Sequence, residues 1–168
     1  DAYGNYVEDL TIDVGRRNPG AVAIDFLASN MGAVRRVRLI APDDSGRTGL
    51  SMERKWPGPL LVSDVRVSGF DVGIAVRHRE YGVTLENVVL RGQRRVALSN
   101  TSNMLSVRKL TVDGNATALV NSADDGMVVL DGLQLLGRSG NGADWADSRG
   151  YLTMRDVVLV GAELTSAV

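Results

Sequence analysis

Two short segments of this 168-residue chain hold its densest group of side chains that could do chemistry. They are SMERKWPGP, residues 51–59, and AVRHREYGV, residues 75–83, which together supply Glu53, Arg54, Lys55, Trp56, Arg77, His78, Arg79, Glu80 and Tyr81. Flat aromatic faces beside a few polar groups are common in ligand sites. Trp56 and Tyr81 could stack on a sugar ring while the charged groups hold its hydroxyl or carboxylate groups. The alternative is loop packing, because an aromatic residue beside a proline often only covers an edge of the fold.

Two kinds of catalysis are compatible with this cluster. A glycoside hydrolase needs two carboxylates roughly 5 to 9.5 Å apart, and only Glu53 and Glu80 form a carboxylate pair with aromatic neighbours. A polysaccharide lyase needs a base and a cation that holds the uronate carboxylate. The candidates for these two roles are Lys55, Arg77 or His78 as the base and Arg54 or Arg79 as the cation.

Several other chemistries find no support. The chain has no cysteine and a single histidine, which excludes thiolate and multi-histidine metal sites. The aspartate doublets Asp43/Asp44 and Asp124/Asp125 fall in expected turns, and no compact carboxylate cluster has the spacing of calcium ligands. Calcium stays open as an alternative that no motif supports, and we expect no other metal or cofactor. Neither a G-x-S-x-G motif nor a glycine-rich phosphate loop occurs.

A repeated pattern shows which elements must position the cluster. The pattern apolar-x-apolar-x-x-apolar-x-apolar occurs seven times, at steps of 22 to 28 residues, and its third apolar positions are Leu10, Val37, Val65, Val88, Leu110, Leu133 and Val157. Such a period is typical of one coil of a solenoid, and the alternation predicts strands with one buried face.

Each copy of the pattern ends in a turn and is followed by a second apolar centre. In the last five copies a glycine lies four residues after the third apolar position, at Gly69, Gly92, Gly114, Gly137 and Gly161. We expect the backbone there to turn through a conformation that a Cβ atom would resist. A further strand is predicted around Ile24, Leu50, Ile74, Leu98, Leu119 and Trp145.

The repeat predicts an all-β fold, a right-handed parallel β-helix of about seven coils with three short strands in each. Hairpin dipeptides are scarce, which disfavours a sandwich or an antiparallel barrel. A leucine-rich repeat would need a fixed asparagine, whereas the residue before the third apolar position varies. We expect residues 1–168 to form one β-helical domain, and we interpret it as a segment of a longer β-helix whose open coils could otherwise pair with another copy.

Composition limits the partners. The net charge is −1 and no basic tract interleaved with aromatic residues occurs, so we do not expect nucleic acid as a partner. No apolar run of about 18 residues is present, so we do not expect a membrane-spanning helix. Equivalent outward residues of successive coils should stack into ladders, and Arg38, Arg66 and Arg91 could line a groove for an acidic sugar chain. The alternative is ordinary solvated surface balanced by nearby carboxylates.

Three segments carry a resemblance to a known family: NYVEDLTIDVGRRNPGAVAIDFLASN, GPLLVSDVRVSGFDVGIAV and YGVTLENVVLRGQ. They resemble middle coils of bacterial proteins of the pectate-lyase-like superfamily, particularly those described as glycosyl-hydrolase-28-related. The resemblance implies a secreted or cell-surface protein that engages polysaccharide, as a glycoside hydrolase or polysaccharide lyase. The catalytic motifs of polygalacturonases and pectate lyases are missing, so a non-catalytic carbohydrate-binding module and a tailspike-like structural segment stay open as alternatives.

Overall fold

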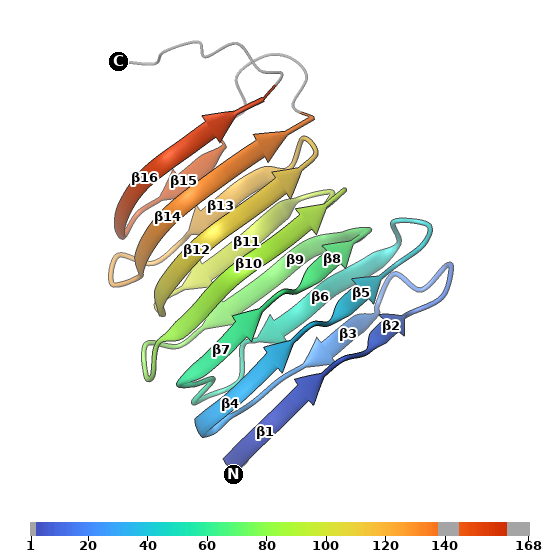
Figure 1. The fold of residues 1–168 in the computed structure, drawn as a ribbon, viewed down its shortest axis with the longest axis horizontal. Helices are drawn as coiled ribbons and strands as arrows, with labels where there is room; N and C mark the ends of the chain where they lie inside the picture. The colour runs from blue at the N-terminus through green and yellow to red at the C-terminus, as the bar shows by residue number, and fades with distance from the viewer. Residues whose placement is uncertain (1–2, 138–144, 161–168) are drawn as a thin grey trace.

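The computed structural model describes residues 3–137 and 145–160 as an all-β parallel solenoid of about six turns (Figure 1). Its strands are β1 (Tyr3–Glu8), β2 (Thr11–Asp13), β3 (Val22–Asp25), β4 (Ser29–Arg35), β5 (Arg38–Ile40), β6 (Gly46–Met52), β7 (Leu60–Ser63), β8 (Arg66–Ser68), β9 (Phe70–Arg77), β10 (Val83–Arg91), β11 (Val96–Thr101), β12 (Met104–Asp113), β13 (Thr117–Asn121), β14 (Met127–Leu136), β15 (Ala146–Ser148) and β16 (Tyr151–Leu159). The described residues contain no helix, and therefore none long and apolar enough to cross a membrane.

The strands form two stacked sheets, one drawn in front of the other in Figure 1. The larger sheet runs β1-β4-β7-β10-β12-β14-β16, with β2, β5 and β8 beside this path, and the smaller sheet runs β3-β6-β9-β11-β13-β15. Each strand pairs in parallel with its equivalents in the coils before and after it. The repeated pattern is therefore the coil of a parallel solenoid, as predicted.

The register between coils tests the predicted columns residue by residue. Within the larger sheet, Val88 pairs with Leu110, Leu110 with Leu133, and Leu133 with Val157, so the repeat was aligned correctly. The smaller sheet aligns Ile24, Leu50, Ile74, Leu98 and Leu119 in the same way. The prediction of Trp145 as the strand centre in the last coil was wrong by one residue, because Leu119 pairs with Ala146 and Trp145 lies just before β15.

The core is a column of apolar side chains between the two sheets. Leu50, Ile74, Leu98 and Leu119 of the smaller sheet are fully buried, as is Val37 of the larger-sheet repeat. Full burial of each such side chain stabilises the fold by about 1.5 to 3 kcal/mol. Because each coil adds another layer to the same column, the core extends along the solenoid axis.

A left-handed residue bends the chain within every copy of the pattern. The residue before the third apolar position has a positive φ in all seven copies, at Asp9, Arg36, Asp64, Asn87, Lys109, Gly132 and Asp156. In the first three coils this bend separates two short strands, giving the expected three strands per coil. From β10 onward there are two strands per coil instead, because the sheet pairing resumes directly after the bend and joins the first two segments into one strand.

The predicted turning glycines behave as expected where the structure describes them. Gly69, Gly92, Gly114 and Gly137 all have positive φ. The fifth, Gly161, lies outside the described residues. At Gly69 an added Cβ would also overlap the carbonyl oxygen of Ala41 in the preceding coil, so this glycine permits a close backbone approach as well as a turn.

Candidate functional site

Trp56 and Tyr81 lie on neighbouring turns of the solenoid. Residues 53–59 connect β6 to β7, and residues 78–82 connect β9 to β10. Met52 and Val76 at the ends of β6 and β9 pair with each other, which brings the two turns side by side. The turns also touch, because a Cβ added at Gly58 would lie 3.0 Å from the carbonyl oxygen of Tyr81.

Both aromatic side chains face solvent from strained backbone positions. Trp56 is 38% exposed and Tyr81 is 48% exposed. Trp56 and Tyr81 have positive φ of 63° and 66°, which is uncommon for bulky residues, and His78 between them has a φ of 74°. Such conformations persist only where the surrounding structure holds them.

A buried asparagine holds the second turn from the inside. Asn103 is fully buried, and its Nδ2 atom donates hydrogen bonds to the carbonyl oxygens of His78 at 2.6 Å and Tyr81 at 3.3 Å. Its Oδ1 atom accepts a hydrogen bond from the backbone N–H of Val83. One side chain therefore pairs with three backbone groups around the turn that presents Tyr81.

Asn103 belongs to a larger network of buried amides. Asn100 Nδ2 donates to the carbonyl oxygen of Asn103 and to Asn121 Oδ1, both at 2.9 Å. Asn121 continues the network to Ser148 Oγ in the next coil at 3.0 Å. These residues were not predicted from the sequence. The available signal was their position, since Asn100 and Asn121 each lie two residues after a buried leucine and therefore face inward.

The arginines of the cluster are already paired with carboxylates. Arg54 contacts Asp25 of the preceding coil at 2.5 Å, Arg77 contacts Glu53 at 3.8 Å, and Arg79 contacts Asp125 at 3.7 Å. Hydrogen bonding to Asp25 raises the pKa of Arg54 above its ordinary value. All these side chains are well exposed, and exposed ion pairs of this kind contribute about 0 to 1 kcal/mol.

The other candidates differ in their contacts. Glu53 Oε2 also accepts a hydrogen bond from Ser51 Oγ at 3.4 Å. The Lys55 ammonium lies 5.0 Å from the centre of the Trp56 ring, in a cation–π arrangement. Glu80 has no ion-pair partner in the part of the chain that the structure describes, and His78 is half-buried. Residues 3–137 and 145–160 include no group of three or more acidic or histidine side chains that could hold a metal ion.

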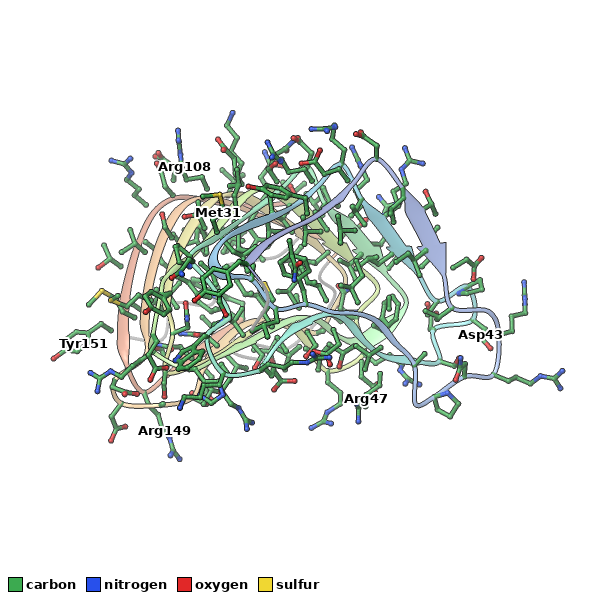
Figure 2. The ribbon with its side chains drawn as sticks, turned by 90° about the horizontal axis from the view of Figure 1, so that it is seen from below. Met31, Asp43, Arg47, Arg108, Arg149 and Tyr151 are labelled. Atoms are coloured by element: carbon green, nitrogen blue, oxygen red, sulfur yellow. The ribbon has the colours of Figure 1, made fainter. Side chains whose placement is uncertain are left out.

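A shallow depression of about 470 Å³ lies next to the two turns, on the outer face of the larger sheet. Pro59 and Gly82, the last residues of the two turns, line it together with Tyr6, Met31 and Thr84. Figure 2 looks along the solenoid and shows Met31 and Arg108 on this face, with Arg47 on the opposite one. The depression was not predicted from the sequence, because its walls come from four strands that are distant in sequence.

The predicted arginine ladder is only partly assembled. Arg38 and Arg66 pair in register on β5 and β8, both are exposed, and neither has a carboxylate within 4 Å among the described residues. Arg91 lies beside Ser68 in the next outward row, as its position three residues after Val88 predicts, and its Nε atom contacts Asp113 at 2.8 Å. The structure thus brings together two of the three predicted residues and ties the third to a neighbouring aspartate.

A row of ion pairs also crosses the outer face of the larger sheet. It consists of Glu8 with Arg35 at 2.7 Å, Glu86 with Arg108 at 3.8 Å and Asp131 with Arg155 at 2.6 Å. The hydrogen bond from Arg155 holds the pKa of Asp131 below its usual value. Much of the arginine content therefore balances carboxylates on adjacent coils, as the solvated-surface interpretation expects.

Fold and surface together define the class of this protein as an all-β parallel solenoid with an exposed aromatic cluster on two adjacent turns. No protein-family model matches the chain, and neither the curated proteins nor the solved structures contain a match.

Proposed function

We propose that this solenoid binds polysaccharide through the turns that carry Trp56 and Tyr81. The observation that carries the proposal is the pairing of two exposed aromatic side chains on touching turns, at the edge of a depression. Tryptophan and tyrosine side chains have a large apolar face, which can stack on a sugar ring, and a polar N–H or O–H group, which can bond to its hydroxyl groups. Buried Asn103 supports the proposal because it holds the backbone of Tyr81 in place before any ligand binds.

Binding is favoured over catalysis by what the candidate catalytic groups contact. Glu53 is engaged by Arg77 and Ser51, and Lys55 lies over the Trp56 ring. Glu80 is the carboxylate of the cluster that is left without an ion-pair partner among the described residues. Glycoside hydrolysis requires two carboxylates with separate roles, so a single unengaged one supports a binding module.

The resemblance to pectate-lyase-like proteins is part of the same proposal. Parallel coils with a short period are compatible with that superfamily, and we propose a right-handed coil and a secreted or cell-surface location on this ground. Neither nucleic acid nor a membrane is part of the proposal. Pairing of copies through coil ends is a separate proposal, which the concentration dependence of the molecular mass in solution would test.

The proposal is tested by incubating the chain with a panel of neutral and uronate polysaccharides. Binding, new reducing ends and the absorbance of unsaturated products are followed together. We expect binding without products, weakened at least about fivefold by Trp56→Ala or Tyr81→Ala. Tyr151→Ala is the matched control, because Tyr151 is also an exposed tyrosine but lies in the last described coil (Figure 2).

Other outcomes would replace the proposal. Products that disappear in Glu53→Gln or Glu80→Gln would make the protein a glycoside hydrolase, and unsaturated products that disappear in Lys55→Ala or His78→Ala would make it a lyase. The absence of binding and of products on every glycan would leave a structural segment.

A further inference from the structure

We propose that the depression beside Tyr81 is a subsite for an uncharged sugar, so that the bound polysaccharide is a neutral one. This inference rests on the proposed function, because the depression continues the surface of the two turns. It adds the position of a subsite and the charge of the ligand to that function, and each of these can be tested separately.

The depression has the makeup of a sugar subsite. Its lining is mainly apolar, with Tyr6, Met31 and Pro59 among its walls. Polar groups are supplied by Asn30, Thr84 and Arg35, and the Arg35 guanidinium is paired with Glu8 at 2.7 Å. Its volume of about 470 Å³ lies within the range of about 300 to 1,000 Å³ usual for ligand pockets. Tyr6 and Met31 are 51% and 58% exposed, so both stand out into solvent.

The register accounts for the hollow at this place. Tyr6 pairs with Ala33, Ala33 with Leu61, and Leu61 with Thr84, so these four residues form one outward row across β1, β4, β7 and β10. Within this row the large side chain of Tyr6 is followed by the small side chain of Ala33. Gly82, two residues before Thr84 and on the same face, has no side chain. Successive strands are about 4.8 Å apart, so the row extends about 14 Å along the solenoid. An extended glycan can therefore lie across the coils.

The depression and the aromatic turns form one continuous surface. Gly82 lines the depression and directly follows Tyr81 in the chain. A Cβ at Gly58 would lie 3.0 Å from the carbonyl oxygens of both Tyr81 and Gly82, so the turn that carries Trp56 lies against the same backbone. A sugar stacked on Tyr81 would thus have its neighbour over the depression.

The charges around this surface cancel. Four arginines are each paired with a carboxylate: Arg35 with Glu8, Arg54 with Asp25, Arg77 with Glu53 and Arg79 with Asp125. The remaining charged groups of the two turns are Lys55, which lies over Trp56, and Glu80. At the arginines a uronate carboxylate would have to displace a protein carboxylate and so would gain little. Among the described residues of the two turns this leaves Lys55 as the cation without a carboxylate partner, and the charge of Glu80 balances it. The hydroxyl groups of a neutral sugar need no such exchange.

Two arginines of the larger sheet that have no ion pair among the described residues lie elsewhere. Arg38 and Arg66 are on β5 and β8, beyond the bends at Arg36 and Asp64, and neither lines the depression. The larger sheet therefore has two surfaces that differ in charge. Beside the aromatic turns the positive and negative side chains are paired, whereas the surface of β5 and β8 has two exposed arginines. We assign the glycan to the balanced surface.

The ligand charge is tested by titrating neutral glucans, galactans and mannans and, in parallel, polygalacturonate and alginate, at low and at high salt. We expect binding to a neutral glycan that changes less than about twofold with salt, because no ligand charge is neutralised. Binding only to uronate glycans, weakened by salt and by Arg38→Ala or Arg66→Ala, would overturn this inference while leaving polysaccharide binding intact. Failure of every glycan to bind would instead overturn the proposed function.

The place of the subsite is tested by filling the depression. Thr84→Tyr adds a large side chain to its lining, and Thr153→Tyr is the matched control because Thr153 occupies the same outward row three coils further along. We expect Thr84→Tyr to weaken binding of the neutral glycan at least about tenfold and Thr153→Tyr to leave it unchanged. Equal binding by both variants would overturn the subsite.

Discussion

Three glycines allow the cost of a left-handed turn to be separated from the cost of a close backbone approach. Gly69 and Gly92 occupy equivalent turns, with φ of 78° and 65°, and each donates its backbone N–H to the next coil. A Cβ at Gly92 would meet nothing within 4 Å, whereas a Cβ at Gly69 would overlap the carbonyl oxygen of Ala41. Gly20 has neither a positive φ nor a neighbour within 4 Å.

The structure therefore predicts a graded series of alanine variants. Gly20→Ala should be neutral or stabilise by up to about 1 kcal/mol, because it only restricts the unfolded chain. Gly92→Ala should destabilise by about 1 kcal/mol through its left-handed backbone. Gly69→Ala adds a backbone displacement of about 1 to 3 kcal/mol, so its total should be about 3 kcal/mol. At about 2 to 4 °C per kcal/mol, the midpoint should fall by roughly 6 to 12 °C in Gly69→Ala.

Urea unfolding followed by circular dichroism and by tryptophan fluorescence measures these differences, with the slope of the transition compared between variants. Equal losses in Gly69→Ala and Gly92→Ala would refute the argument, because they would mean that the contact with Ala41 costs nothing. A loss in Gly20→Ala as large as that in Gly92→Ala would show that the sign of φ is not the cause.

Three further predictions concern the core, the bend and the surface charges. Asn121→Ala should lower the free energy of unfolding by about 2 to 4 kcal/mol in urea titrations, because the buried amide of Asn100 loses one of its two acceptors and the carbonyl oxygen of Gly126 loses a donor; a loss no larger than that of the exposed Asn18→Ala would contradict this. Lys109→Asn should raise the free energy of unfolding by about 0.5 kcal/mol, because asparagine tolerates the positive φ of 55° better than lysine. A lower urea midpoint would contradict a left-handed backbone at this residue. Arg155 depresses the pKa of Asp131, so their pairing stabilises the fold above the unfolded value of about 3.9 and is lost as pH falls through the folded value. Asp131→Asn should therefore show a smaller fall in the urea midpoint between neutral pH and about pH 2 than the unmodified chain, and an unchanged pH dependence would rule out this contribution.

The coil could be predicted because its signal is local and repeated. Alternating apolar residues at a steady period identify the strands, and the register paired Val88 with Leu110 and Leu110 with Leu133 as expected. The turning glycines were equally visible, because a glycine that recurs directly after a strand is typical of a turn with positive φ. The error at Trp145 arose where the repeat is least regular, in the coil that includes residues 138–144.

The left-handed bend was harder to recognise. Its residue type varies from Asp9 to Arg36 to Lys109, and only the aspartates, Asn87 and Gly132 have a local preference for that conformation. Sheet pairing on both sides imposes the positive φ on the arginine and the lysine. Tertiary structure overrides the local conformational preference of these residues. The positive φ is therefore present in every coil although the residue type at this position varies.

The surface of the candidate site depended on which coils become neighbours. The period of the repeat predicted that residues 53–56 and 77–81 would lie on adjacent coils, and the register of β6 with β9 confirms this. The pairing of Arg79 with Asp125, by contrast, joins residues that are well separated in sequence. Ion pairs of this kind decide which charges are available to a ligand, and no spacing rule within one segment reveals them.

The sequence by itself determined the coil, the strand faces and the residues that could bind a sugar, because these follow from local periodicity and side-chain chemistry. Only the tertiary structure decided that the arginines of the two turns are engaged, that buried asparagines support Tyr81, and that a depression lies beside it. The physical reason is that hydrogen bonds, ion pairs and hollows depend on distances between coils, and those distances exist only once the coils have stacked in register.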